Sequence, residues 1–442
     1  MTKSEILRIT QHEQVQFLRM QFSDIHGQIK NVEIPSPQFS LALDSQVLFD
    51  GSSIEGFSRT KEIDMVLVPD LDTFRIFPWE EDKEQHKIAS IICDLYYPDG
   101  REFEGCPRLA LKRVMEKCRK MGYEYNVSSE VEFFMFKQNP DGSPSMTTHD
   151  SAGYFDLLPS GTGETVRRYI VKALENMNYK VESSHHEVAP GQHEIDFMPV
   201  NALSAADYII GCRYVVRKMA NDAGLHATFM PKPLYDKYGS GLHFHQMLFQ
   251  DGDNLFLDTK KPHSLSSKGL GFIGGQLRHA KGYIAITNPL INSYKRLVDN
   301  SEAPTHVLWS ESNVSPLLRL PGQRGSSIRV ESRLPDPSCN PYLALSVLLQ
   351  SGLDGIKSKL DPGQPVNKDI DTMSQRERAR LKIERLPKDL NEALYQLKKN
   401  KVVQAGLGDF IYNHFLAAKT AEWHSYIAQI HPWEIDQYFK YY

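Results

Sequence analysis

Residues 129–136 read SEVEFFMF, in which two glutamates alternate with other residues before four apolar ones follow in a row. Side chains of a strand alternate between its two faces, so a strand here places Glu130 and Glu132 on the same face. Two carboxylates that point the same way repel each other, and a solvated strand face is the simplest interpretation. The apolar run at 133–136 favours a buried strand instead.

A second acidic segment, at 185–196, reads HHEVAPGQHEID and contains the turn signal Pro190-Gly191. If these two residues form a two-residue hairpin turn, Glu187 faces Glu194 across the hairpin. Directly opposed like charges destabilise a hairpin unless something compensates them, and a bound cation would do so. Together the two segments supply four carboxylates, which suit hard ions such as Mg²⁺ or Mn²⁺ better than zinc.

A histidine pair follows in GSGLHFH, residues 239–245. At strand spacing His243 and His245 share one face, and the glycines before them allow backbone to approach a ligand closely. One neutral imidazole added to the carboxylates would favour tolerance of Mn²⁺. A purely structural role for both histidines is an equally good interpretation of the pattern alone.

Arginines gather towards residue 333, where RVESR at 329–333 puts two of them and Glu331 on one strand face. The arginines in question are Arg296, Arg319, Arg329 and Arg333. Guanidinium forks match carboxylate and phosphate oxygens, so they fit an anionic substrate and a nucleotide, although any single arginine could belong to a surface ion pair. With the carboxylates they indicate a metal-bridged phosphoryl-transfer site. Because the sequence has no Walker A motif and no kinase-type glycine-rich loop, another fold must hold the nucleotide.

Around these segments the chain predicts a mixed α/β architecture in two parts, with a boundary near residue 103. The first part reads mainly as strands, for example 16–23 and 28–34 on either side of a turn at His26-Gly27. Pro107 suits the first position of a helix that ends near Gly122. Later strands are expected at 131–137, 194–197, 242–249 and 328–334, and helices at 163–178, 203–222, 265–281, 340–360, 388–400 and 404–430.

Composition excludes several classes of protein. The 442 residues are 40% hydrophobic and 24% charged with a net charge of -4, which argues against a disordered chain or a nucleic-acid binder. No apolar run approaches the roughly 20 residues that span a bilayer, and no signal-peptide core stands at the start, so we expect a cytoplasmic protein. The five cysteines form no Cys-x-x-Cys pair and are expected to be reduced and structural.

In their order along the chain, these segments resemble the motifs of type I glutamine synthetases, in the form found in Gram-positive bacteria. The resemblance covers essentially the whole chain. It rests on Phe49-Asp50-Gly51-Ser52-Ser53, Glu130-Val131-Glu132-Phe133-Phe134, residues 185–194, Gly239 to His243, Asn292-Ser293-Tyr294-Lys295-Arg296, Glu302-Ala303-Pro304 and Asn340-Pro341-Tyr342.

The resemblance implies an α+β fold. A small N-terminal β-grasp-like domain would span residues 1–103, and a catalytic domain with an open curved antiparallel sheet and surrounding helices would span 104–442. It also implies a homo-oligomer, a dodecamer of two stacked hexameric rings, in which the N-terminal domain of one subunit completes the active site of its neighbour.

The resemblance also assigns roles position by position. One metal ion would be held by Glu130, Glu187 and Glu194, and the other by Glu132, His243 and Glu331. Glutamate would be bound by Arg296, Arg333, Glu302 and the backbone around Gly239. ATP would face Glu182, His245, Arg319 and Arg329, with Arg319 also acting in catalysis. Ammonium would be bound and deprotonated by Asp50 with Ser53 nearby, under a flap that carries Glu302, and Arg59 would take part in feedback regulation.

The implied reaction uses ATP and two or more Mg²⁺ or Mn²⁺ ions to join ammonia to L-glutamate through a γ-glutamyl phosphate. Two other functions stay open: a ligase that joins glutamate to a larger amine, and a catalytically weak paralogue that acts as a nitrogen sensor with regulatory partner proteins. They are favoured by departures from the family pattern around the site. These departures are Asp299-Asn300-Ser301 in the flap, Val314 in place of an arginine, Tyr238 in place of an asparagine and Met247 in place of a serine.

Overall fold

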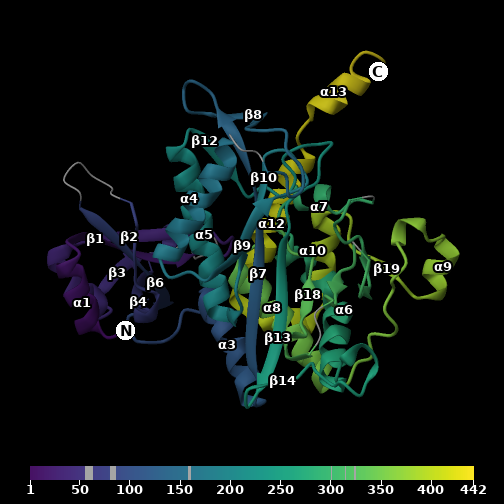
Figure 1. The fold of residues 1–442 in the computed structure, drawn as a ribbon, viewed down its shortest axis with the longest axis horizontal. Coiled ribbons are helices and arrows are strands. Elements are labelled where there is room, and N and C mark those ends of the chain that lie inside the picture. Colours follow the sequence, from purple (N-terminus) through teal and green to yellow (C-terminus); the bar gives the residue numbers. More distant parts are fainter. Residues whose placement is uncertain (55–62, 80–85, 158–160, 300, 314, 323–324) are drawn as a thin grey trace.

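The computed structural model of the chain describes residues 1–54, 63–79, 86–157, 161–299, 301–313, 315–322 and 325–442 (Figure 1). Its N-terminal part is a mixed sheet with strand order β2-β1-β6-β4-β3, in which β5 also pairs with β6. β6 runs parallel to β1 and antiparallel to β4. The elements are α1 (Lys3–His12), β1 (Val15–Ser23), β2 (Ile29–Pro35), α2 (Phe39–Leu43), β3 (Val47–Asp50), β4 (Asp64–Pro69), β5 (Arg75–Ile76) and β6 (Lys87–Tyr96).

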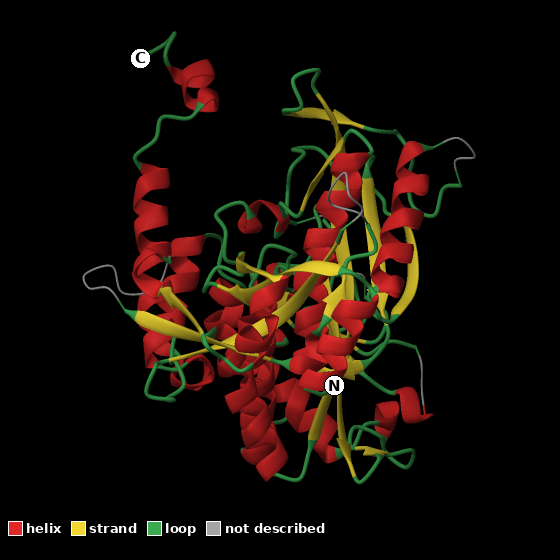
Figure 2. Ribbon diagram, turned by 90° about the vertical axis from the view of Figure 1, so that its left-hand side faces the viewer, coloured by secondary structure: helices red, strands yellow, loops and turns green. Residues whose placement is uncertain are grey.

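A larger sheet forms the second part, with strand order β16-β17-β18-β13-β7-β10-β9. Along this order the neighbours are antiparallel except for β16 and β17. Its strands are β7 (Glu124–Gln138), β8 (Pro144–Thr148), β9 (Val181–His186), β10 (Gln192–Phe197), β11 (Val200–Asn201), β12 (Leu225–Thr228), β13 (Leu242–Gln250), β14 (Asp253–Asn254), β16 (Trp309–Ser310), β17 (Leu318–Arg319) and β18 (Val330–Ser332). Figure 2 shows the long strands of this sheet flanked by helices.

The helices follow most of the predicted ranges. They are α3 (Pro107–Lys120), α4 (Thr162–Asn176), α5 (Ala202–Asp222), α6 (Ser267–Thr287), α7 (Ser293–Arg296), α8 (Pro341–Lys357), α9 (Gln375–Arg380), α10 (Leu390–Lys399), α11 (Lys401–Leu407), α12 (Asp409–Ile427) and α13 (Pro432–Tyr438). A separate ribbon joins β15 (His306–Val307) to β19 (Glu384–Arg385). Among the described residues, no helix combines the length and the apolar character that crossing a membrane requires.

Two predicted elements need correction. The single helix expected at 404–430 is wrong, because Gly408 adopts φ 80° and separates α11 from α12. A positive φ cannot continue a right-handed helix, and glycine adopts it at little cost. The strand expected at 328–334 is shorter, since only Val330–Ser332 pairs with β13 and β17.

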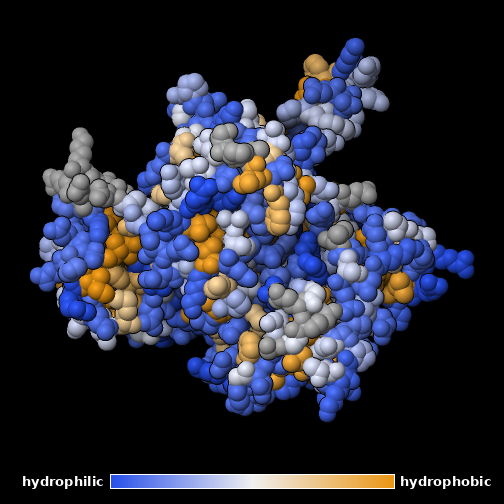
Figure 3. Space-filling model, in the orientation of Figure 1, coloured by the Kyte–Doolittle hydropathy of each residue, from blue (hydrophilic) through white to orange (hydrophobic). Residues whose placement is uncertain are grey.

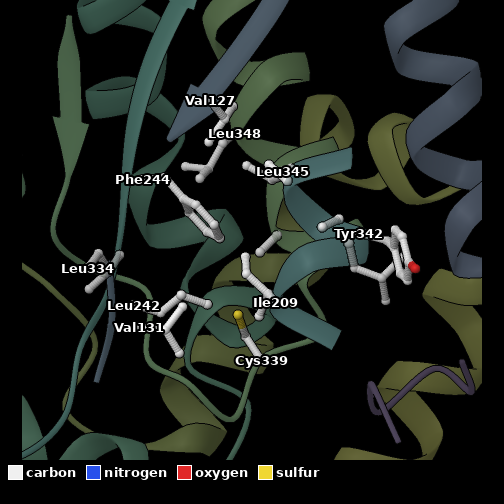
Figure 4. Packing of buried hydrophobic residues seen from close by; sticks show 14 of the residues in the cluster. Val127, Val131, Ile209, Leu242, Phe244, Leu334, Cys339, Tyr342, Leu345 and Leu348 are labelled. Atoms are coloured by element: carbon white, nitrogen blue, oxygen red, sulfur yellow. The ribbon is translucent and has the colours of Figure 1, made fainter. Parts of the chain in front are cut away.

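The core lies between the large sheet and α8 (Figure 4). Val131 of β7 and Leu242 of β13 pair across the sheet, and both are fully buried. They lie in one apolar cluster with Leu345 and Leu348 of α8. Because strand side chains alternate, the acidic residues on either side of Val131 must point to the opposite face.

One buried polar network joins the two parts of the chain. Arg108, at the start of α3, donates to both carboxylate oxygens of Asp207 at 3.0 and 2.9 Å. It also donates to Asp94 at 3.1 Å and to Asp70 at 2.7 Å, both from the N-terminal part. Tyr342 of α8 donates to Asp207 at 2.7 Å. A single guanidinium therefore fixes α3, α5 and the N-terminal sheet relative to one another.

Candidate active site

The acidic residues converge on the face of the large sheet that turns away from α8. β7 lies between β13 and β10. The register places His243 opposite Glu130, and places Glu194 opposite Glu132. Asp196 lies opposite Glu130 on the β10 side. Directly paired residues of an antiparallel sheet share a face, so three strands bring these side chains together.

The hairpin between β9 and β10 differs from its prediction. β9 ends at His186, and Glu194 faces His185 rather than Glu187, a register shift of two residues. The amide of Gln192 donates to the carbonyl of Ala189 at 3.0 Å, so Pro190 and Gly191 are the central residues of a β-turn. The amide of Glu187 donates to the carbonyl of Gln192 at 2.8 Å, which leaves extra residues between β9 and this turn. Gly191 has φ 70°. Proline cannot adopt the positive φ that a tight hairpin turn requires at its first central position, which explains the extra residues.

The first cluster surrounds Glu130. Its Oε2 lies 2.8 Å from Nδ1 of His243, and its Oε1 lies 2.5 Å from Nε2 of His245. Glu331 is buried, and its Oε1 lies 3.9 Å from Nδ1 of His243. Its carboxylate accepts hydrogen bonds from Arg333 at 2.5 Å and from Arg319 at 3.2 Å. Burial alone would raise the pKa of Glu130, but His245 and His243 hold it well below its ordinary value.

The second cluster contains Glu132, Glu187 and Glu194. Burial and the neighbouring Glu187 raise the pKa of Glu132 to about 8. Burial and Glu132 raise the pKa of Glu194 well above its ordinary value. His185 lies between Glu187 and Glu194, with its Nε2 3.2 Å from Glu194 and its Nδ1 3.7 Å from Glu187. The raised pKa values show that the protein does not neutralise this group of carboxylates, as expected for a cation site.

The contacts group the two β7 glutamates differently from the sequence-based expectation. Glu130 lies 2.8 Å from His243, whereas Glu132 lies 3.9 Å from it. Glu132 is the residue directly opposite Glu194. No motif singled out His185, Gln192 or Asp196, although Gln192 and Asp196 are at strand spacing from Glu194 and share its face.

A small pocket beside these clusters is lined by all four residues expected to bind glutamate. Its lining includes Glu132, Glu187, Gln192, Tyr238, Gly239, His243, Arg296, Glu302 and Arg333. Arg296 is buried, and its guanidinium donates to the carbonyls of Leu334 at 2.9 Å and Arg333 at 3.1 Å. A side chain at Gly239 would overlap the carbonyl of Pro231, so only glycine fits there.

The remaining predicted residues lie apart from this pocket or outside the described chain. Glu182 is exposed on β9, and Met247 is buried on β13. Arg319 is 40% exposed, and Arg329 is half-buried just before β18. The side chain of Ser53, together with Arg59, Asn300 and Val314, is outside the described part of the structure.

Asp50 stands at the end of β3 in the N-terminal part. Its carboxylate accepts from the amide of Ser52 at 2.8 Å, from the Ser52 hydroxyl at 2.7 Å and from the amide of Ile63 at 3.4 Å. These hydrogen bonds, led by that of the Ser52 amide, lower its pKa. Asp50 does not line the pocket that holds Glu132 and Arg296.

Two family models match the chain. "Glutamine synthetase, beta-Grasp domain" matches residues 14–98, and "Glutamine synthetase, catalytic domain" matches residues 104–438. The chain is 51% identical over 443 residues to the glutamine synthetase of Thermus thermophilus, covering 100% of this chain and 99% of that protein. It is 48% identical over 442 residues to that of Staphylococcus aureus, with the same coverage.

Solved structures resemble the chain over almost its full length. One, described as "GmaS/ADP complex-Conformation 1", is 30% identical with a TM-score of 0.88, covering 98% of this chain and 99% of that one. A second, described as "Apo GmaS without ligand", has the same identity and coverage and a TM-score of 0.87.

Proposed function

This chain belongs to the glutamine synthetase family, and from that premise we propose that it is a glutamate–ammonia ligase, which converts L-glutamate, ammonia and ATP to L-glutamine, ADP and phosphate. The observation that supports this most directly is the pair of carboxylate clusters on one sheet face beside a pocket that contains Arg296 and Arg333. The fold is the expected α+β arrangement, with a β-grasp N-terminal domain and a catalytic domain.

The donor set fits two divalent cations. Oxygen ligands with a single imidazole suit Mg²⁺ or Mn²⁺, and the unneutralised carboxylates around Glu132 would be compensated by such ions. We propose that one ion is held by Glu130, His243 and Glu331, and the other by Glu132, Glu187 and Glu194. This exchanges the two β7 glutamates relative to the assignment that the resemblance implied. Bound there, the ions would neutralise charge on the transferred phosphoryl group.

The protein's own residues would bind and orient the substrates. Arg333 and Arg296 would hold glutamate at the pocket, with Gly239 leaving room for it. A carboxylate is a poor acyl donor, because its leaving group would be oxide. Phosphorylating the γ-carboxylate of glutamate first provides phosphate as the leaving group instead. Arg319 and Arg329 would face the nucleotide beside Glu182 and His245. The neighbouring structure that is described as an ADP complex supports a nucleotide site in this fold.

Ammonium binding is proposed to need a second subunit. Asp50 has the charge to bind ammonium and accept a proton, but within one chain it does not line the pocket. Bringing Asp50 and Ser53 of one subunit to the pocket of another would complete the site, with Glu302 at its rim. A homo-oligomer of two stacked hexameric rings meets this requirement, and Arg59 is proposed as its regulatory residue.

The test is phosphate release from ATP and glutamate with Mg²⁺, comparing ammonium with methylamine and a short diamine at matched free-amine concentration. A preference for ammonium supports the proposal. A preference for a larger amine would identify a γ-glutamyl-amine ligase. The observation that favours this alternative is Asp299, a departure from the family pattern in the flap, which accepts a hydrogen bond from Arg385 at 3.0 Å. ATP binding without amine-dependent phosphate release would favour a sensor and contradict both ligase functions.

A further inference from the structure

Behind the β9–β10 turn, on the face away from the carboxylates, lies a polar cluster that the proposed reaction does not use. Nε2 of His149 lies 2.9 Å from Nε2 of His193, and Nδ1 of His193 lies 2.8 Å from Nη1 of Arg167. Nδ1 of His149 faces Oδ2 of Asp150 at 3.2 Å. His193 is fully buried and His149 lies almost entirely within the protein.

The positions of the protons follow from the chemistry of these contacts. Arg167 can only donate, so Nδ1 of His193 is an acceptor and its ring proton lies on Nε2. Nε2 of His193 then donates this proton to Nε2 of His149, so both rings are neutral, and burial also lowers the pKa of His149. The proton of His149 is therefore on Nδ1, which has no hydrogen-bond partner among the described residues although Oδ2 of Asp150 lies 3.2 Å away. The hydrogen bonds run in one direction, from Arg167 through His193 to His149.

This arrangement does not suit a metal ion, although His149, Asp150 and His193 lie close enough for one. The two facing nitrogens are already joined through a proton. The Arg167 guanidinium at the far side of His193 would also repel a cation.

The cluster instead holds both ends of the turn. Oδ1 of Asp150 accepts from the amide of Gly191 at 2.8 Å, and its carboxylate lies 3.2 Å from Nε2 of His186. His186 directly precedes Glu187, and His193 directly precedes Glu194. The two residues are also paired across β9 and β10. A displacement of His149 would therefore shift the positions of Glu187 and Glu194, two of the proposed metal-binding residues.

We propose that His149 is a positioning residue for the second metal ion: through His193 and Asp150 it fixes the turn that carries Glu187 and Glu194. This inference rests on the metal set of the proposed function. Groups that orient ligands from behind typically change metal affinity by about 10- to 100-fold when they are removed.

A substitution at Gly163 provides an independent way to displace His149. A side chain at Gly163, in the first turn of α4, would overlap Cε1 of the His149 ring. Arg167 follows one helical turn later on the same face. Substituting Gly163→Ala would push the imidazole out of place without removing any polar group of the cluster.

The experiment is a titration of the EDTA-treated, full-length assembled protein with Mn²⁺, without substrates, following free Mn²⁺ by electron paramagnetic resonance. His149→Gln keeps an acceptor at the position of Nε2, whereas His149→Asn keeps only the Nδ1 side and His149→Phe keeps neither. His226→Gln, on β12 of the same sheet, is the matched control. We expect about 10-fold or greater loss of affinity at one ion in His149→Asn, His149→Phe and Gly163→Ala, and near wild-type binding in His149→Gln and His226→Gln.

Mn²⁺ binding by His149→Phe and Gly163→Ala as tight as in the wild type would overturn the inference. If those two variants failed to fold, equal affinity of the Gln and Asn variants would overturn it. Binding is measured apart from turnover, so a protein that binds two Mn²⁺ and shows the expected losses supports the positioning role even if it forms no glutamine. A wild-type protein that binds no Mn²⁺ would remove both the metal set and this inference.

Discussion

At the scale of the residue, the property that distinguishes the buried glutamates of the site is whether a neighbouring side chain compensates their negative charge. Glu132 and Glu194 face each other across two strands, and within the described part of the chain neither accepts a hydrogen bond from an arginine, as Glu331 does from Arg333. The pKa of Glu132 is therefore raised to about 8, while that of Glu331 is lowered because Arg333, His245 and His243 together outweigh the effect of burial. The same residue type thus takes two protonation states within one site.

This difference predicts how the metal-free protein responds to pH. A carboxyl whose folded-state pKa is about 8 binds more protons in the folded than in the unfolded state, where its pKa is about 4.3. Stability therefore falls as pH rises through this window. Between about pH 5 and about pH 8 we expect the melting temperature of the metal-free protein to fall, less so in Glu132→Gln, and saturating Mg²⁺ to reverse the trend. Calorimetry across pH is the check, and an identical slope in both proteins would contradict it.

At the scale of the element, the sequence predicted types better than connections. The alternation in SEVEFFMF identified β7 and its acidic face, and Pro107 marked the start of α3. The turn at Pro190-Gly191 was placed correctly, but the register of β9 against β10 was wrong by two residues, because the proline ring forbids the tight hairpin turn that the prediction assumed. The break at Gly408 was missed, since a glycine inside a helical pattern does not show whether its φ is positive. His149 carried no signal, because its partners are brought to it only by the fold.

The packing of α6 on α8 gives a prediction at this scale. A side chain at Gly275 would overlap the carbonyl oxygen of Ser351, a backbone atom that cannot move aside. Gly275→Ala should lower the free energy of unfolding by about 1–3 kcal/mol through overpacking. Gly322→Ala, where a side chain meets none of the described residues within 4 Å and φ is not positive, should stay within about 0.5 kcal/mol of the wild type. Urea unfolding of both variants decides; equal stabilities would show that α6 and α8 can separate freely.

At the scale of the whole molecule, Arg108 joins the two parts of the chain, and sequence patterns did not reveal it because its partners lie far apart in sequence. Arg108→Leu leaves Asp207, Asp94 and Asp70 without their shared cation, so we expect a loss of about 3–5 kcal/mol. Arg101→Leu breaks a surface pair with Asp99, which is 54% exposed, and should leave the stability close to that of the wild type. Chemical denaturation would show whether the two variants differ; similar losses would mean that the buried network adds nothing to stability.

The C-terminal segment links this scale to assembly. α13 extends away from the body of the chain (Figure 1), and apolar surface is visible on it (Figure 3). Trp433 is 62% exposed and Phe439 is 81% exposed, in a segment that also exposes Ile430 and Tyr442. Exposed apolar groups gathered on one projecting element are typical of a contact with another chain.

If this segment holds subunits together, Trp433→Ser with Phe439→Ser should shift the assembly to smaller species in light scattering. Amine-dependent phosphate release should fall with it, because Asp50 would no longer reach a neighbouring pocket. Mn²⁺ binding should persist, since the six proposed metal-binding residues belong to one chain. Tyr395→Ser removes an aromatic that is 54% exposed on the body of the protein and serves as the control. Small species that keep full activity would show that each chain completes its own site, and that Asp50 does not act on a neighbour.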